Sequence, residues 1–145
     1  GICVLIPGIP GVSDNITVRS IVGRFLEHSR IFWFRNGGRE ELYVSSADWM
    51  PRNLNDRVEL MVPIEDPEIK RRLKQMVDIE LSDNQKAHIM QADGTWLKTI
   101  SAENQLCAQE DFQKIAEKRD AEDEMTLAQK LEPYTPVLGH GDGSD

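Results

Sequence analysis

The chain has 145 residues, of which 39% are hydrophobic and 29% are charged, and its formal net charge at pH 7 is −8. This length predicts one domain with a core and excludes two domains of ordinary size. No apolar run approaches the roughly 18 residues that a membrane-spanning helix needs, so the sequence predicts no transmembrane segment.

The negative charge is concentrated at the C-terminal end. Residues 1–63 carry seven Arg and seven acidic residues, residues 64–119 carry nine basic and eleven acidic residues, and residues 120–145 carry one Lys and seven acidic residues. Because no half of the chain is basic, nucleic-acid binding through net charge is disfavoured. Residues 1–63 contain no Lys. A guanidinium group can bind two oxygens of a phosphate or carboxylate at once, so the use of Arg without Lys hints at anion recognition. Ordinary ion pairs on the surface explain it equally well.

The first elements are predicted from short apolar runs. Residues 2–6 are apolar and precede Pro7-Gly8, which predicts a buried strand followed by a loop over residues 7–15. Four apolar residues then recur at i, i+3, i+4 and i+7, which predicts an amphipathic helix; they are Val18, Ile21, Val22 and Phe25. The chain lacks an initiator Met and begins within an apolar run, so we expect a piece of a longer polypeptide.

A β-hairpin is the strongest local signal. Residues 30–35 are rich in aromatic residues, which favours a strand, and Asn36-Gly37-Gly38 is typical of a hairpin turn because primed turns need positive φ. Residues 42–45 are predicted as the return strand. The aromatic residues at positions 32–34 are interpreted as core rather than as a stacking platform, since only one face of a strand could meet a ligand.

The C-terminal half continues the alternation of strands and helices. Residues 57–64 alternate apolar and polar, which predicts a strand, and Asp66-Pro67 opens a helix. The remaining predicted elements are strands over residues 86–91 and 96–100, a helix over residues 103–119, and an acidic tail over residues 120–145 that we expect to be disordered or loosely attached. This order indicates a mixed α/β fold.

Chemistry-bearing residues gather on the predicted hairpin. If the strand begins at His28, then His28 and Arg30 face the same side. The return strand brings Ser45, Ser46 and Asp48 back to that end, because the turn closes the other end. An imidazole can act as a nucleophile or as a general acid or base near neutral pH, and guanidinium and hydroxyl groups can bind phosphate oxygens. The set therefore suits phosphoryl transfer. A capped histidine and a serine-rich turn before the next helix explain the same residues without any catalysis.

A family resemblance favours the interpretation of these residues as a phosphoryl-transfer site. The stretches GICVLIPGIPGVSDNITVRSIVGRFLEHSRIFWF, NGGREELYVSSADWMPRN and VELMVPIEDPEIKRRL resemble the C-terminal catalytic domain of bacterial polyphosphate kinase. The resemblance continues more weakly through DNQKAHIMQADGTWLK to about residue 109. It implies a phospholipase D-like domain over residues 1–119, with a mixed sheet flanked by helices, that forms one half of a two-domain active site.

The phospholipase D pattern is only partly present. It consists of His-x-Lys, four residues, Asp, and a later Gly-Ser-x-Asn. His28 matches the His, Arg30 stands at the Lys position and Arg35 at the Asp position, while residues 45–48 (SSAD) replace the Gly-Ser-x-Asn element. These departures count against phosphodiester hydrolysis of the phospholipase D type.

The resemblance implies a reversible ATP:polyphosphate phosphotransferase that uses Mg²⁺ with ATP and a phosphohistidine in a preceding domain. It implies that His28 acts as general acid/base or as electrostatic partner of the phosphoryl group, and that Arg30 binds phosphate. Ser45, Ser46 and Asp48 are expected to line the site. Arg52 is expected to line a polyphosphate channel or to form a salt bridge. No metal ligands are predicted within the chain.

Further expectations follow for partners and location. The resemblance implies ATP or ADP and polyphosphate as ligands, upstream domains as partners, a homo-oligomeric full-length enzyme and an isolated chain without activity. We expect a cytoplasmic location or a peripheral association with a membrane. Cys3 and Cys107 show no metal-ligand spacing and are expected to be reduced thiols. The alternative function is a non-catalytic domain that binds polyphosphate or another polyanion.

Overall fold

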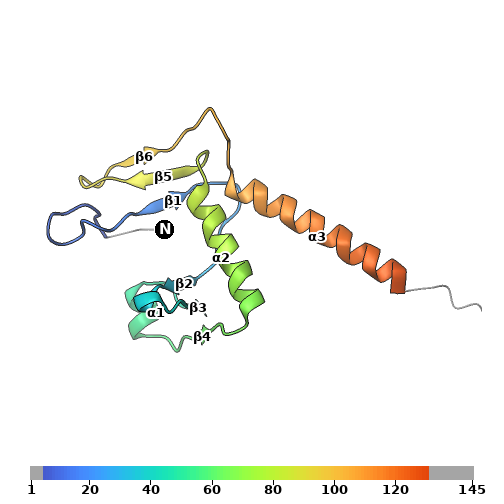
Figure 1. Ribbon diagram of the computed structural model, residues 1–145. Coiled ribbons are helices and arrows are strands. Elements are labelled where there is room, and N and C mark those ends of the chain that lie inside the picture. Colours follow the sequence, from blue (N-terminus) through green and yellow to red (C-terminus); the bar gives the residue numbers. More distant parts are fainter. Residues whose placement is uncertain (1–4, 131–145) are drawn as a thin grey trace, which may run out of the picture. The chain divides into compact units, whose positions relative to one another are not determined.

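The computed structural model describes residues 5–130, with the side chains of residues 5–122 (Figure 1). The strands are β1 (Arg19–Ile21), β2 (Ile31–Phe34), β3 (Glu41–Ser45), β4 (Met61–Pro63), β5 (Ala87–Met90) and β6 (Trp96–Lys98). The helices are the 3₁₀ turn η1 (Asn36–Gly38), α1 (Pro51–Asn55), α2 (Pro67–Ser82) and α3 (Ala108–Lys130). The chain divides into two compact units, residues 1–111 and 112–145. The predicted α/β class is confirmed.

The strands form two three-stranded sheets, with the orders β1-β5-β6 and β2-β3-β4 (Figure 1). All four strand pairs among the described residues are antiparallel, so the prediction of one mixed sheet is wrong for this part of the chain. For β2–β3 and β5–β6 the physical reason is that short connections join the strands, whereas parallel pairing needs a crossover of about a dozen residues or more.

The amphipathic helix predicted at Val18–Phe25 is wrong. Residues 19–21 form β1, in which Arg19 pairs with Ile89 and Ile21 pairs with Ala87. Pairing with a strand almost 70 residues away overrides a periodicity of only eight residues, and the β-branched residues in this window favour a strand. Gly23 follows, and the chain then runs without regular structure until β2.

The predicted hairpin is confirmed. β2 and β3 pair antiparallel with Ile31 opposite Val44 and Phe34 opposite Glu41. The turn between them uses positive φ at three successive positions, 35° at Asn36, 65° at Gly37 and 99° at Gly38. Glycine adopts such angles without steric cost, which is why this sequence reverses direction here.

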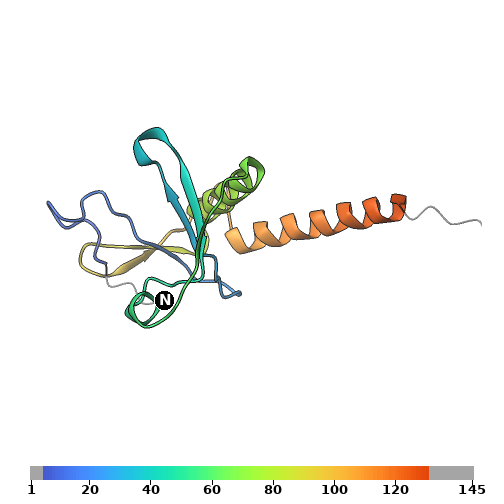
Figure 2. The ribbon, with the colours of Figure 1, turned by 90° about the horizontal axis from the view of Figure 1, so that it is seen from below.

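Helix α2 begins where the sequence predicts, and it lies beside the strands of both sheets (Figures 1 and 2). The Asp66 carboxylate caps it by accepting hydrogen bonds from two backbone N–H groups, and Pro67 is its first residue. Near the middle of α2, the Lys74 ammonium lies 4.9 Å from the ring centre of Trp33 on β2. At its end, Glu80 and Leu81 line a cavity with Arg19 and Ile21 of β1.

Helix α3 differs from its predicted bounds of residues 103–119. It begins at Ala108, after a loop in which Asn104 has a φ of 49°, and it continues to Lys130. The acidic composition of residues 120–130 suggested a tail, but this stretch also contains Ala, Glu, Met, Leu and Lys, which are good helix formers. The division of the chain at residue 119 stays a prediction, and residues 131–145 lie outside the described residues.

Other predicted elements are confirmed with shorter bounds. β4 covers residues 61–63 of the predicted 57–64, and β5 and β6 end before the positions predicted for them. β4 lies at the edge of its sheet, where the missing N–H of Pro63 is tolerated. Of the strand predicted over residues 2–6, residues 2–4 lie outside the described residues, and residues 5 and 6 are not part of a strand.

The buried interior is small and unusually polar. Leu42 is the single large apolar side chain among the buried residues of the described chain, together with Ala47, Ala87, Cys107 and Ala108. Many large apolar residues stay exposed, including Phe34, Trp49 and Leu97. The fold within residues 5–111 therefore depends on polar contacts more than a self-contained core would require.

The buried carboxylate of Asp83 is the centre of these polar contacts. Asp83 is 1% exposed and follows α2. Its Oδ1 accepts hydrogen bonds from the backbone N–H groups of Gln85, Lys86 and Ala87, and its Oδ2 accepts one from Ala108. Burial raises the pKa of this carboxyl, but the four N–H donors outweigh it and hold the pKa below its usual value. One ionised side chain thus joins the end of α2, the start of β5 and the start of α3.

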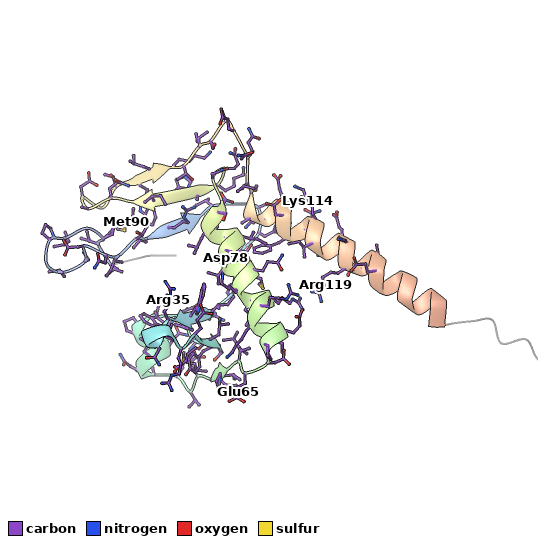
Figure 3. The ribbon with its side chains drawn as sticks, in the orientation of Figure 1. Arg35, Glu65, Asp78, Met90, Lys114 and Arg119 are labelled. Carbon is purple, nitrogen blue, oxygen red and sulfur yellow. The ribbon has the colours of Figure 1, made fainter. Side chains whose placement is uncertain are left out.

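Replacing this carboxylate is expected to destabilise the fold strongly. In Asp83→Asn the amide NH₂ must face at least one backbone N–H, so two donors oppose each other in a buried place. We expect the free energy of unfolding to fall by about 2–4 kcal/mol, measured by urea titration. The exposed Asp78 on α2 (Figure 3), which pairs with Lys74 at 2.9 Å, gives the matched control Asp78→Asn, for which we expect little change.

The pH dependence follows from the depressed pKa. Since the folded-state pKa of Asp83 lies below its unfolded value, its contribution to stability is present above about pH 4 and is lost as the pH falls through the folded-state pKa. The difference between wild type and Asp83→Asn should shrink on acidification. An equal difference at pH 7 and pH 3 would contradict this account.

Candidate phosphate-binding site on the β2–β3 hairpin

The hairpin brings three of the predicted residues together at its open end. The backbone N–H of Ser45 donates to the carbonyl of Arg30 at 3.0 Å, which places the end of β3 opposite the residue before β2. Arg30 Nε donates to Asp48 Oδ1 at 2.7 Å, and the Arg30 Nη2 atom lies 3.4 Å from His28 Nδ1. His28, Arg30 and Asp48 therefore form one connected group.

The contact between Arg30 and His28 orients the imidazole. A guanidinium can only donate hydrogen bonds, so this contact is a hydrogen bond when His28 Nδ1 is unprotonated, and in that form the neutral ring carries its proton on Nε2. At 3.4 Å this is a weak interaction. It leaves Nε2 as the nitrogen that can donate a proton to a ligand or exchange one with it.

The Arg30–Asp48 pair holds the guanidinium in place. The Arg30 side chain is 24% exposed and that of Asp48 is 40% exposed. The hydrogen bond from Arg30 holds the pKa of Asp48 below its usual value, with further contributions from the charges of Arg30, His28 and Arg52. The hydrogen bond to Asp48 also raises the pKa of Arg30. Among the described residues, the other N–H groups of this guanidinium have no hydrogen-bond acceptor besides His28, and they can bind an anion.

The two serines are engaged elsewhere. Ser45 Oγ donates to the carbonyl of Leu60 at 3.1 Å and accepts from the N–H of Ala47 at 3.0 Å. Ser46 Oγ donates to Glu59 Oε2 at 2.5 Å. A hydroxyl has one proton to donate, so neither serine can donate to a phosphate in this arrangement without giving up its present partner.

Glu59 and Asn53 are parts of the site region that the sequence did not suggest. Asn53 Nδ2 donates to Glu59 Oε1 at 2.8 Å, while Ser46 donates to the other carboxylate oxygen. The hydrogen bond from Ser46, followed by that from Asn53, holds the pKa of Glu59 below its usual value. Glu59 stands at a polar position of the alternating RVELMV run, and this position is the one signal that could have indicated it.

Arg52 lies on α1 and reaches Asp48 through its charge, which contributes to the lowered pKa of that carboxyl. No hydrogen bond or salt bridge of the Arg52 side chain is found within residues 5–122, so the salt-bridge interpretation of this residue is not supported there. The SSAD segment does not cap α1, because the residue before that helix is Met50 and no side chain caps it.

An aromatic surface lies on the same face of the hairpin as Arg30. Residues 30, 32 and 34 alternate with residues 31 and 33 and share one face of the strand. Phe32 stacks on Trp49 with ring centres 5.7 Å apart, and both line an open cavity of about 220 Å³ with Phe34. Trp49 is 76% exposed. The interpretation of residues 32–34 as core is therefore wrong for Phe34, whereas Trp33 packs against α2 from the opposite face.

The described residues contain no cluster of three His, Cys, Asp or Glu side chains able to hold a metal ion. Within residues 5–130, no helix combines the length and the apolar character that crossing a membrane requires. Cys107 is a free, buried thiol, and Cys3 lies outside the described residues.

The hydrogen bonds on Glu59 can be tested one at a time. Ser46→Ala removes a donor that favours the ionised form, so the pKa of Glu59 should rise toward its usual value. The measurement is a ¹³C NMR titration of the Glu59 side-chain carboxyl. Ser45→Ala is the matched control, because its hydroxyl bonds Leu60 and Ala47 instead. Equal rises in both variants would show that the effect comes from general loosening of the hairpin.

Comparison with known proteins identifies the family. Residues 1–109 match the family described as "Polyphosphate kinase C-terminal domain 2". The chain is 55% identical to the polyphosphate kinase of Pseudomonas aeruginosa over 105 residues, which is 72% of this chain and 15% of that protein. It is 52% identical to polyphosphate kinase 1 of Chlorobaculum tepidum over 114 residues, which is 79% of this chain and 16% of that protein.

A solved structure agrees with the sequence comparison. The crystal structure of polyphosphate kinase from Porphyromonas gingivalis matches with a TM-score of 0.76 and 38% sequence identity, over 83% of this chain and 19% of the other. The chain thus spans about a sixth of the length of the relatives that it matches. On the evidence of its sequence and its fold, the chain belongs to the C-terminal domain family of the polyphosphate kinases.

Proposed function

We propose that this chain forms one wall of the active site of a polyphosphate kinase, which moves the terminal phosphoryl group of ATP reversibly to inorganic polyphosphate. The observation that carries the proposal is the group of His28, Arg30 and Asp48, held together at 2.7 Å and 3.4 Å within a chain whose first 109 residues match the family. Phosphoryl transfer depends on positioning and on stabilisation of charge, and this group supplies both.

Each residue has a distinct part in the proposed reaction. In one direction the phosphoryl group leaves ATP, which becomes ADP, and is held on a histidine of a preceding domain before the end of a polyphosphate chain takes it. Arg30 binds the phosphate oxygens through the N–H groups that Asp48 and His28 leave open. His28 supplies or accepts a proton, or stabilises negative charge, through Nε2. Arg52 extends the positive surface toward the polyphosphate chain, while Ser45, Ser46 and Glu59 shape the wall.

The proposal treats Mg²⁺ as part of the ATP substrate complex. The carboxylate of the site, Asp48, is paired through Oδ1 with the Arg30 guanidinium, and a carboxylate paired in this way is a weaker ligand for a cation. This chain offers phosphate contacts to such a complex, and the ion contributes charge neutralisation on the phosphates when it is bound.

The rest of the site is proposed to come from other parts of the same polypeptide. The exposed rings of Phe34 and Trp49 beside Arg30 support this, because exposed apolar surface of this kind typically packs against another domain. We further propose a phospholipase D-like arrangement of the complete domain, a homo-oligomeric full-length enzyme and a cytoplasmic location, with peripheral membrane association as the alternative location. The isolated chain is then expected to have no kinase activity.

The second candidate is a domain that binds polyphosphate or another polyanion without taking part in chemistry. The positive charges of Arg30 and Arg52, which both act on Asp48, support it, because cations are enough to bind a polyanion. The two candidates differ in what they require of His28. Binding requires cations and tolerates the loss of an imidazole, whereas catalysis does not.

The decisive test replaces His28 in a full-length polyphosphate kinase that contains this domain. We expect His28→Ala to lower the rate of ATP-dependent polyphosphate synthesis by about a hundredfold or more, which is the scale of a lost general acid/base. His88→Ala is the control, because His88 lies on β5 and contacts the backbone of Lys86. An unchanged rate in His28→Ala would make the domain a binding wall.

Binding is tested separately in the same enzyme. Arg30→Ala should weaken polyphosphate binding and reduce its dependence on salt concentration, because one cation fewer contacts the polyanion. Arg39→Ala removes the same charge at the far end of the hairpin, beyond the turn. It should leave the polyphosphate affinity and its dependence on salt concentration unchanged. Equal losses in the two variants would show an unspecific effect of net charge and count against a phosphate site at Arg30.

A further inference from the structure

The segment that carries His28 has few attachments of its own. Residues 22–30 join β1 to β2 without regular secondary structure. The N–H of Val22 donates to the carbonyl of Lys86, the residue before β5, and the carbonyl of Arg30 accepts from the N–H of Ser45 on β3. Among the described residues, the hydrogen bonds that hold the backbone between these two points come from one side chain, that of Gln109 at the start of α3.

The side chain of Gln109 forms hydrogen bonds with both backbone polar groups of Phe25 in this segment. Its Oε1 accepts from the N–H of Phe25 at 3.0 Å, and its Nε2 donates to the carbonyl of Phe25 at 2.7 Å. Nε2 also lies 3.2 Å from Glu27 Oε1. A carboxamide is suited to this task because it offers an acceptor and a donor side by side without a charge.

The pair of hydrogen bonds between Gln109 and the Phe25 backbone, called the clamp below, is closely packed on both sides. Gln109 is 6% exposed, and the residue before it donates its N–H to the buried carboxylate of Asp83. On the other side, Gly23 leaves room for the carboxamide, since a Cβ at this position would lie 2.2 Å from Gln109 Oε1. A series of contacts therefore runs from Asp83 through Gln109 to Phe25, three residues before His28.

We propose that Gln109 is a positioning residue for His28. Its carboxamide fixes the backbone at Phe25 and thereby fixes the place of the imidazole relative to Arg30. A displacement of about 1 Å in a catalytic group can cost about a hundredfold in rate. This inference rests on the proposed function, since it concerns the geometry of the same site.

Gln109→Glu in a full-length polyphosphate kinase tests the clamp without changing its size. As a carboxylate, residue 109 still accepts from the N–H of Phe25, but it repels the Phe25 carbonyl and the carboxylate of Glu27. Protonation restores the missing donor. The charged groups in this region are Glu27, Glu80 of α2, Arg24 beside Phe25, and Glu110 and Asp111 on α3 itself.

The expected result is a loss of turnover that depends on pH. The kcat of Gln109→Glu relative to wild type should fall about 10- to 100-fold at alkaline pH and recover as the pH falls through the pKa of the new carboxyl, while the KM for ATP stays within about twofold. Gln113→Glu makes the same charge change one turn later, at an exposed position, and should keep the wild-type pH profile. Thermal melts across the pH range show that each variant stays folded where its rate is measured.

Two outcomes would overturn the inference. One is a kcat for Gln109→Glu equal to wild type at every pH, and the other is a loss that does not change with pH. If Gln109→Glu does not fold, Gly23→Ala decides, because it displaces the carboxamide without altering it and should lower kcat without a new pH dependence. An unchanged kcat in Gly23→Ala would then reject the clamp. The parallel variant His28→Ala separates the two proposals, since normal activity in that variant rejects the proposed function whatever residue 109 does.

Discussion

The ionised side chain of Asp83 is the interaction on which the rest of the described fold depends. Four backbone N–H groups from two regions converge on it, and the backbone carbonyl of the same residue accepts a hydrogen bond from Arg19 of β1 at 2.6 Å. A buried charge is tolerated only when donors of this kind replace its hydration. One residue thereby fixes where α2 ends, where β5 and α3 begin, and how β1 lies against them. The position of Gln109, and through it the segment before His28, follows from that arrangement.

Local signals explain which parts of this fold could be predicted. The Asn36-Gly37-Gly38 turn and the Asp66-Pro67 helix start act through their own backbone preferences, so the sequence reports them directly. The prediction for residues 18–25 failed because a helical stripe of only eight residues is a weak signal, and pairing of this segment with β5 overrode it. The contacts of Asp83, Glu59 and Gln109 could not be predicted, because each joins residues that are brought together only by the folded chain. Phe25 and Gln109, for example, are 84 positions apart.

The small apolar interior gives these polar contacts unusual weight. In a domain of this length, several large apolar side chains would ordinarily be buried. Within the described residues, Leu42 is the one large apolar side chain that is buried, and the other buried apolar residues are small. Phe34 on β2, with Trp49 and Leu60 beside the same sheet, is exposed, and all three line one open cavity. Exposed aromatic surface of this extent is costly in water unless another surface covers it. The same face that presents Arg30 is therefore suited both to packing against further protein and to binding phosphate at its edge.

An Arg residue at position 30 suits a face that combines an exposed apolar surface with a candidate anion-binding edge. The guanidinium binds Asp48 through Nε and approaches His28 through Nη2, so it sets the orientation of both neighbours while it keeps further N–H groups for an anion. A Lys ammonium is a point charge on a flexible stem and could not define the two directions at once. Asp48 in turn stays ionised, chiefly because the hydrogen bond from Arg30 holds its pKa below the usual value. In the function proposed above, the Arg30 fork would be held in place before a phosphate binds, and this would reduce the reorganisation that binding or transfer requires.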